Sequence, residues 1–202
     1  MQKLIIGTNN QAKGTEFKKF LDGCGYKIVI PNELGLDGDV EETGTTFKAN
    51  AELKARHFFD QTGLPTLADD GGIEIDALNG EPGIYSRRWK SKAESLPSAE
   101  MTDPEMVDYT LEQMKGIPLE KRTARLTMTI CLIKPDCEPI FVTGNIEGYI
   151  AEKVVADYRP GFPFRALFVC SEFDKPYSDL TEAEHDQVNH RKKACDEIKK
   201  YL

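Results

Sequence analysis

The stretch Pro65-Thr66-Leu67-Ala68-Asp69-Asp70-Gly71-Gly72-Ile73-Glu74-Ile75-Asp76-Ala77 decides the fold. Its first part is mainly apolar, which predicts a short buried strand over residues 65–68. Residues 73–77 alternate apolar and acidic side chains, as is typical of a half-exposed strand. Asp-Gly is a common turn dipeptide, so we expect residues 69–72 to turn the chain between these two strands.

Helical patterns alternate with strand patterns on both sides of this stretch. Residues 46–62 place apolar side chains on one helical face, and Gly63 supplies the residue that ends the helix. Further strands are expected at 3–7, 27–30, 126–132, 139–143 and 149–151, and further helices at 12–22, at 103–115 with Asp103 as N-cap, and from about 184 to 202. The mixed order predicts an α/β or α+β class with a mixed sheet. A second lobe is expected over residues 116–180, within one domain spanning 1–202.

Length and charge exclude several classes of protein. The chain has 202 residues, and its 26 basic and 34 acidic side chains give a net charge of −8. A net-acidic chain is a poor binder of nucleic-acid polymers, which are held by Lys and Arg. No apolar run approaches the roughly 20 residues of a membrane span, and the apolar part of residues 1–7 is too short for the signal peptide of a secreted protein. We therefore expect a cytoplasmic protein without a membrane or nucleic-acid partner, its five cysteines being reduced structural thiols.

The first candidate site follows the N-terminal strand. Thr8, Asn9 and Asn10 precede the helix that carries Lys13. A helix N-terminus offers unpaired N–H groups that suit a phosphate, and Lys13 adds a cation. Simple helix capping by Thr and Asn is the alternative explanation.

The second candidate site is acidic. Asp69 and Asp70 follow a buried strand, where adjacent carboxylates repel each other unless a cation compensates them. In the acidic segment Asp39-Val40-Glu41-Glu42-Thr43-Gly44, Glu41 or Glu42 would complete a magnesium site with Asp70, and Lys54 would meet phosphates. The alternatives are a solvated turn and an acidic surface loop.

A third group of residues suits a nucleobase. Asn189, His190 and Arg191 offer an imidazole and a planar guanidinium that stack on a base or donate to its edge. An exposed basic helix face is the alternative. Together with the phosphate and magnesium candidates, these residues describe a site for a nucleoside triphosphate.

Four motifs carry a resemblance to a known family: Thr8-Asn9-Asn10-x-x-Lys13, Glu41-Glu42-Thr43-Gly44-x-Thr46-Phe47-x-x-Asn50-Ala51-x-x-Lys54-Ala55-Arg56, Ala68-Asp69-Asp70-Gly71-Gly72-Ile73-Glu74-Ile75-Asp76-Ala77-Leu78 and Gly80-x-Pro82-Gly83-Ile84-Tyr85-Ser86-x-Arg88. They resemble the inosine/xanthosine triphosphate pyrophosphatase (RdgB-like) family. The match is close over about the first 90 residues and continues more loosely to the His190-Arg191 pair.

The resemblance implies a two-lobed α/β fold with an elongated mixed sheet, a cleft between the lobes as active site, and a homodimer. It implies Mg²⁺-dependent hydrolysis of a purine nucleoside triphosphate, deaminated or otherwise modified, to the monophosphate and pyrophosphate, which removes unwanted nucleotides from the pool. By position, residues 8–13 and Gly71 bind substrate, and Glu41 and Asp70 hold magnesium. Asp70 also acts as the base, Lys54 neutralises phosphate charge, and Asp69 is grouped with these catalytic residues.

The segment that reads the base departs from the family pattern. Phe162, His190 and Arg191 are kept as substrate-binding residues. Arg165, which we also expect to bind the substrate, stands where the family has an acidic residue. His185 and Asn189 replace a Lys and a Ser of the pattern. We therefore expect an altered base preference. Two alternatives stay open, namely a pyrophosphatase for a pyrimidine or other modified nucleotide and a nucleotide-binding protein with little turnover.

Overall fold

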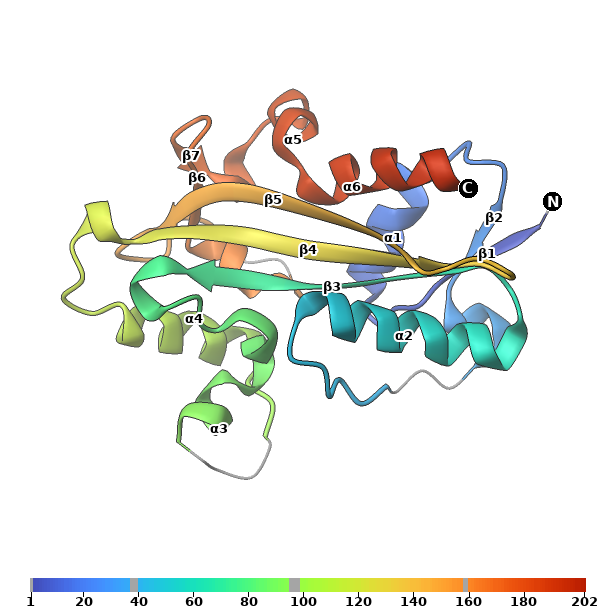
Figure 1. Ribbon diagram of the computed structural model, residues 1–202. Coiled ribbons are helices and arrows are strands. Elements are labelled where there is room, and N and C mark those ends of the chain that lie inside the picture. The colour runs from blue at the N-terminus through green and yellow to red at the C-terminus, as the bar shows by residue number, and fades with distance from the viewer. Residues whose placement is uncertain (1, 37–39, 95–98, 158–159) are drawn as a thin grey trace. The chain divides into compact units, whose positions relative to one another are not determined.

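The computed structural model describes residues 2–36, 40–94, 99–157 and 160–202 (Figure 1). Among these residues, seven strands form one open sheet in the order β2-β1-β3-β4-β5-β6-β7. The sheet is mixed because β1 pairs in parallel with β2 and β3, whereas β6 pairs antiparallel with β5 and β7. The strands are β1 Lys3–Ile6, β2 Lys27–Val29, β3 Thr66–Ile75, β4 Thr123–Ile133, β5 Ile140–Ile150, β6 Phe168–Cys170 and β7 Lys175–Pro176. The predicted α/β class with a mixed sheet is confirmed.

Six α-helices accompany the sheet in the described part of the chain: α1 Gln11–Phe20, α2 Phe47–Thr62, α3 Trp89–Ala93, α4 Asp103–Gln113, α5 Glu182–Val188 and α6 His190–Ile198. Helix α2 begins where the Thr46 hydroxyl accepts the Ala49 N–H at 3.1 Å, and it ends at Gly63 in the left-handed region (φ 64°). The predicted helix is confirmed with its C-terminal end at Thr62, and Thr46 is its N-cap and not its first helical residue. The predicted helix over 184–202 is wrong in its continuity, because Asn189 leaves helical geometry (ψ 107°) between α5 and α6.

The turn expected at 69–72 is absent. Strand β3 runs without interruption from Thr66 to Ile75, so the Asp-Asp-Gly-Gly segment is extended. Pairing between strands outweighs the local preference of Asp-Gly for turns. The strands expected at 139–143 and 149–151 are likewise one strand, β5.

The N-cap expected at Asp103 is also corrected. Thr102 caps α4 and forms a capping box with Glu105. The carboxylate of Asp103 instead accepts hydrogen bonds from Arg87 and from the Gly161 N–H, each at 2.7 Å. The side chain of Asp103 is therefore committed to the tertiary structure.

The chain divides into two compact units. Unit 1 comprises residues 1–71, 128–144 and 190–202, and unit 2 comprises residues 72–127 and 145–189. The lobe expected over residues 116–180 draws on both units. None of the helices among the described residues combines the length and apolar character needed to cross a membrane.

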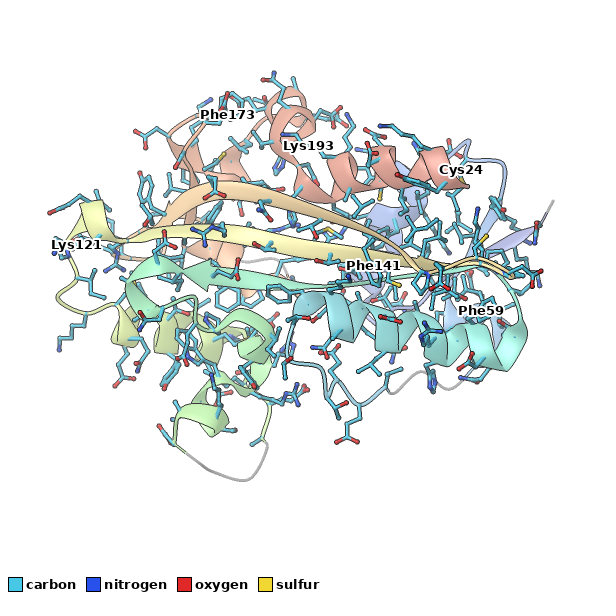
Figure 2. The ribbon with its side chains drawn as sticks, in the orientation of Figure 1. Cys24, Phe59, Lys121, Phe141, Phe173 and Lys193 are labelled. Atoms are coloured by element: carbon cyan, nitrogen blue, oxygen red, sulfur yellow. The ribbon has the colours of Figure 1, made fainter. Side chains whose placement is uncertain are left out.

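Unit 1 has apolar packing on both faces of its strands. One core joins α1 and α6 to β1 and β4, with Leu4, Phe17 and Ile198 wholly buried and Cys24 at its margin. On the other face, α2 packs Ala51 and Ala55 against β3 and β4. Figure 1 shows α6 and α2 on opposite sides of this part of the sheet, and Figure 2 marks Phe59 and Phe141, which pack against the α2 core.

Unit 2 has its own core, which includes Trp89 and Tyr177. Inside this unit, the buried guanidinium of Arg122 donates to four backbone carbonyl oxygens, those of Met114, Ile117, Ile150 and Ala151, at 2.7–3.3 Å. Arg122 thereby ties the end of α4 to the end of β5.

Candidate active site

Asp69 and Asp70 lie on opposite faces of β3. Because successive side chains of a strand point to opposite sides of the sheet, Asp69 shares the face of Leu67, which packs with α1 and α6. Asp70 shares the face of Ala68, which packs with α2. The continuous strand therefore separates the two carboxylates that the sequence analysis placed together in a turn.

Asp69 is held among cations from two helices. Its carboxylate is 2% exposed and lies 3.0 Å from the ammonium of Lys13 on α1 and 3.7 Å from the guanidinium of Arg191 on α6. Arg191 also donates to Glu16 of α1. Burial alone would raise the pKa of Asp69, but Lys13, Arg191 and Lys54 lower it to about 2. Asp69 is therefore ionised at neutral pH and neutralises Lys13 and Arg191.

Asp70 is held from α2. Lys54 donates to its Oδ1 at 3.2 Å, and the side-chain amide of Asn50 donates to its Oδ2 at 3.1 Å. Lys54 also donates to Glu42 at 2.7 Å. Burial and the nearby Glu42 carboxylate raise the pKa of Asp70 although Lys54 opposes them. The environment of Asp70 thus favours proton uptake, whereas that of Asp69 disfavours it.

The segment before α1 shows the geometry of a helix cap. Asn10 is the N-cap, and its Oδ1 accepts the N–H groups of Ala12 and Lys13 at 3.0 and 3.2 Å. The Thr8 hydroxyl accepts the Asn10 N–H at 3.2 Å, while Asn9 is exposed. The capping explanation is therefore confirmed, and a phosphate-binding role for these residues stays a prediction.

The acidic segment contributes Glu42 to the cluster around Asp70. Glu41 is exposed and its assignment as a metal ligand stays a prediction, while Asp39 lies outside the described residues. The residues that the structure describes contain no group of three His, Cys, Asp or Glu side chains arranged to hold a metal ion. Magnesium commonly takes only one or two carboxylates and fills its other positions with water and substrate phosphates. The carboxylates of Asp70 and of the 41–42 segment fit that requirement.

His190 and Arg191 open α6 within unit 1, and both are buried. The strand β5 passes close to them, because a Cβ added to Gly144 would lie 2.6 Å from the carbonyl oxygen of His190. A glycine at this position allows β5 and the start of α6 to approach each other. Gly71, a further predicted substrate-binding residue of this unit, follows Asp70 in β3 and is half-buried.

The predicted base-binding residues Phe162 and Arg165 belong to unit 2. The guanidinium of Arg165 lies over the Phe162 ring, 3.9 Å from its centroid, and 5.2 Å from the centroid of Tyr177. The His185 ring meets Tyr177 edge-on at 4.6 Å. Arg165 is thus a buried cation stacked among aromatic rings.

A family model described as the Ham1 family matches residues 4–201. This chain belongs to the Ham1 family. It is 35% identical to a dITP/XTP pyrophosphatase of Bacillus subtilis over 202 residues, covering 100% of this chain and 98% of that protein. A dITP/XTP pyrophosphatase of Vibrio parahaemolyticus is 37% identical over 196 residues, covering 96% and 93%. The solved structure of a HAM1 protein from Coxiella burnetii has a TM-score of 0.84 and 31% identity, covering 100% and 98%. The resemblance inferred from the motifs is therefore confirmed.

Two residues of this Ham1 chain meet the cluster without having been assigned a role from the sequence. Asn50 contacts Asp70, and Glu16 pairs with Arg191. Asn50 did leave a signal, because an asparagine among the apolar positions of a helix is a poor helix former and needs another reason to be buried. Glu16 left none, since it lies 175 residues from its partner.

Proposed function

We propose that this chain hydrolyses a purine nucleoside triphosphate, deaminated or otherwise modified, to the monophosphate and pyrophosphate with Mg²⁺. The reaction would remove unwanted nucleotides from the pool. The observation that carries the proposal is the cluster in which Asp70 meets both Lys54 and Asn50, with Glu42 on the same lysine. The names of the relatives support the same chemistry.

The phosphate chain is proposed to bind at the start of α1. Thr8, Asn9, Asn10 and Lys13 supply neutral donors and one cation there, and Lys54 neutralises phosphate charge near Asp70. Phosphoryl transfer asks little of a protein beyond alignment and charge compensation. We assign Asp69, grouped above with the catalytic residues, to holding Lys13 and Arg191 in place.

Magnesium is proposed to be held by Asp70 together with Glu41, with Glu42 as the neighbouring carboxylate of the same segment. When bound, the ion supplies charge neutralisation for the phosphates. The carboxylate oxygens of these residues are the ligand type that a hard divalent ion takes.

Asp70 is proposed to orient and deprotonate the attacking water. The water oxygen bonds to the α-phosphorus while the bond from that phosphorus to the oxygen bridging to the β-phosphate breaks. The water proton passes to the Asp70 carboxylate, and pyrophosphate leaves. Asp70 suits this role better than Asp69, because Asp69 is buried between cations that hold it ionised.

The base preference is proposed to differ from that of the relatives. Arg165 has only hydrogen-bond donors, so it favours a base edge that presents acceptors. It lies over Phe162, on which a base would be expected to stack. Arg165→Asp should shift the ratio of kcat/KM values toward inosine and xanthosine triphosphates, whereas Arg165→Lys should not. An unchanged ratio in Arg165→Asp would remove Arg165 from base recognition.

We also propose that the chain acts in the cytoplasm as a homodimer and as one catalytic domain. The support is the family resemblance, which implies both a dimer and a two-lobed domain. Light scattering coupled to gel filtration tests the oligomeric state directly.

The experiment that tests the activity is a substrate panel. Purified protein with Mg²⁺ is mixed with purine and pyrimidine triphosphates, and pyrophosphate and inorganic phosphate are measured separately. We expect pyrophosphate without inorganic phosphate, and turnover of at least one purine triphosphate. No turnover of any triphosphate in the panel would overturn the proposal.

A further inference from the structure

Helix α2 contacts Asp70 and the 42–44 segment through two side chains that lie one helical turn apart. Asn50 and Lys54 are spaced i and i+4, so their side chains lie on the same face of the helix. Asn50 donates to Oδ2 of Asp70, and Lys54 donates to Oδ1. Each of the two also reaches the 42–44 segment: Oδ1 of Asn50 accepts the Gly44 N–H at 2.8 Å, and Lys54 donates to Glu42 at 2.7 Å.

The contact with Gly44 fixes the orientation of the Asn50 amide. Because the Gly44 N–H needs an acceptor, the oxygen of Asn50 faces Gly44, and its NH₂ group is left to face Asp70. Asn50 is wholly buried, so the amide has no solvent-exposed alternative orientation. An aspartate at position 50 would satisfy Gly44 equally well but would oppose Asp70 with a second carboxylate.

Gly44 is itself packed against the amide. A Cβ added to Gly44 would lie 2.5 Å from Oδ1 of Asn50 and 2.8 Å from the Cβ of Ala49. A side chain at position 44 would therefore displace Asn50 while leaving every polar group of this arrangement in the chain.

We infer that Asn50 is a positioning residue, which sets the rotation of the Asp70 carboxylate and couples it to the 42–44 segment. The inference rests on the proposed function, since it gives Asp70 its orientation toward water and phosphate. Asn50 leaves Oδ1 of Asp70 to Lys54 and keeps the Asp70 carboxylate in an accepting role. It touches neither substrate nor reacting atoms.

The first test compares Asn50→Asp with Gln61→Glu, which adds the same charge at an exposed position of α2. Both are assayed at a temperature at which each is folded. A misplaced catalytic group costs about 100-fold in rate, so kcat of Asn50→Asp should fall by about that factor while KM changes less than about threefold. Gln61→Glu should behave as the wild type. An unchanged kcat in Asn50→Asp, or an equal loss in both variants, would overturn the inference.

The second test uses Gly44→Ala and remains available if Asn50→Asp does not fold. Gly44→Ala keeps all polar groups and should also lower kcat with little change in KM. An unchanged kcat in Gly44→Ala overturns the inference.

A third test does not depend on turnover. The side-chain amide protons of Asn50 should exchange slowly with solvent in the wild type and faster in Asp70→Ala. Equal exchange in the two proteins contradicts the link between Asn50 and Asp70. Failure of the wild type to hydrolyse any triphosphate would instead refute the proposed function and leave this exchange measurement to judge the contact.

Discussion

Asp69 and Asp70 are neighbours in sequence, yet their carboxylates serve opposite faces of β3. Asp69 pairs with Lys13 at 3.0 Å, and Asp70 accepts hydrogen bonds from Lys54 and Asn50 on the other side. Because the two carboxylates lie apart, each has a different cationic partner, and their pKa values shift in opposite directions. Asp69 therefore stays ionised on the side of α1 and α6, whereas Asp70 is the candidate base on the side of α2.

Asp70→Asn should abolish most turnover. Removing a general base lowers rates by about 100- to 10,000-fold, and the Asn side chain still fills the space of the carboxylate. Pyrophosphate release by the variant is measured under saturating substrate. Asp60→Asn, an exposed change at the end of α2, serves as the matched control and should keep wild-type activity. Near-wild-type turnover in Asp70→Asn would show that another group deprotonates the water.

Arg191→Met should destabilise the protein. The guanidinium of Arg191 is buried and faces both Asp69 and Glu16. Breaking a buried ion pair by removing one partner costs about 3–5 kcal/mol, because a buried charge is left without compensation. Denaturant unfolding measures the change. Lys193→Met, an exposed substitution on the same helix (Figure 2), should shift the free energy of unfolding by less than about 0.5 kcal/mol. Equal effects of the two substitutions would contradict the ion-pair account.

Asp69 should make stability depend on pH in the acid range. Its pKa in the folded protein is about 2, below the ordinary 3.8, so the folded state favours the ionised form. The resulting stabilisation of about 2 kcal/mol is present above about pH 4 and is lost as the pH falls toward 2. The free energies of unfolding of the wild type and Asp69→Asn should therefore converge with acidification. A difference that stays constant with pH would place the pKa of Asp69 at its ordinary value.

Gly144→Ala should affect substrate binding more than chemistry. The added methyl group would overlap the carbonyl oxygen of His190 and push the start of α6 away from β5. Overpacking of this kind costs about 1–3 kcal/mol of stability. Because His190 and Arg191 are proposed substrate-binding residues, KM should rise while kcat changes less. A variant with wild-type KM and stability would show that α6 does not need this close approach.

The thiols should divide into reactive and inert groups. All five cysteines are free; Cys137 is exposed, whereas burial raises the pKa of Cys131 and of Cys195 to about 12. The thiolate is the reactive form, so a disulfide reagent at neutral pH should modify Cys137 quickly and the two buried thiols only on unfolding. Mass spectrometry of peptides from briefly treated protein identifies the modified residues. Rapid labelling of Cys195 would show that α6 opens readily.

The sequence predicted well those helices whose ends are set by capping residues close in the chain. Helix α2 is the clearest case, because Thr46 and Gly63 mark its two ends in the sequence and do so in the structure. Strand β3 could not be predicted as one element, because its Asp-Gly pair favours a turn locally and only its pairing partners keep it extended. The break between α5 and α6 at Asn189 was likewise not predictable, because no Gly or Pro marks it in the sequence.

The candidate site was predictable in its residue types and less so in its contacts. Motif resemblance singled out Lys13, Lys54 and Asp70, and the structure gives each of them an ionic partner. The different partners of Asp69 and Asp70 were not predictable, because they follow from the alternation of side chains along an uninterrupted strand. The helical pattern marks Asn50 as an unusual buried residue, but its contact with Asp70 spans twenty residues of chain, and no local pattern identifies that partner.

The central claim is that water attacks the α-phosphorus of the substrate. The most direct test is to find which product carries the oxygen taken from water. Hydrolysis of a nucleoside triphosphate that the protein turns over is run with Mg²⁺ in water enriched in ¹⁸O, and the products are analysed by mass spectrometry. Attack at the α-phosphorus predicts one labelled oxygen in the nucleoside monophosphate and unlabelled pyrophosphate. Label in the pyrophosphate, or release of labelled inorganic phosphate, would contradict the account.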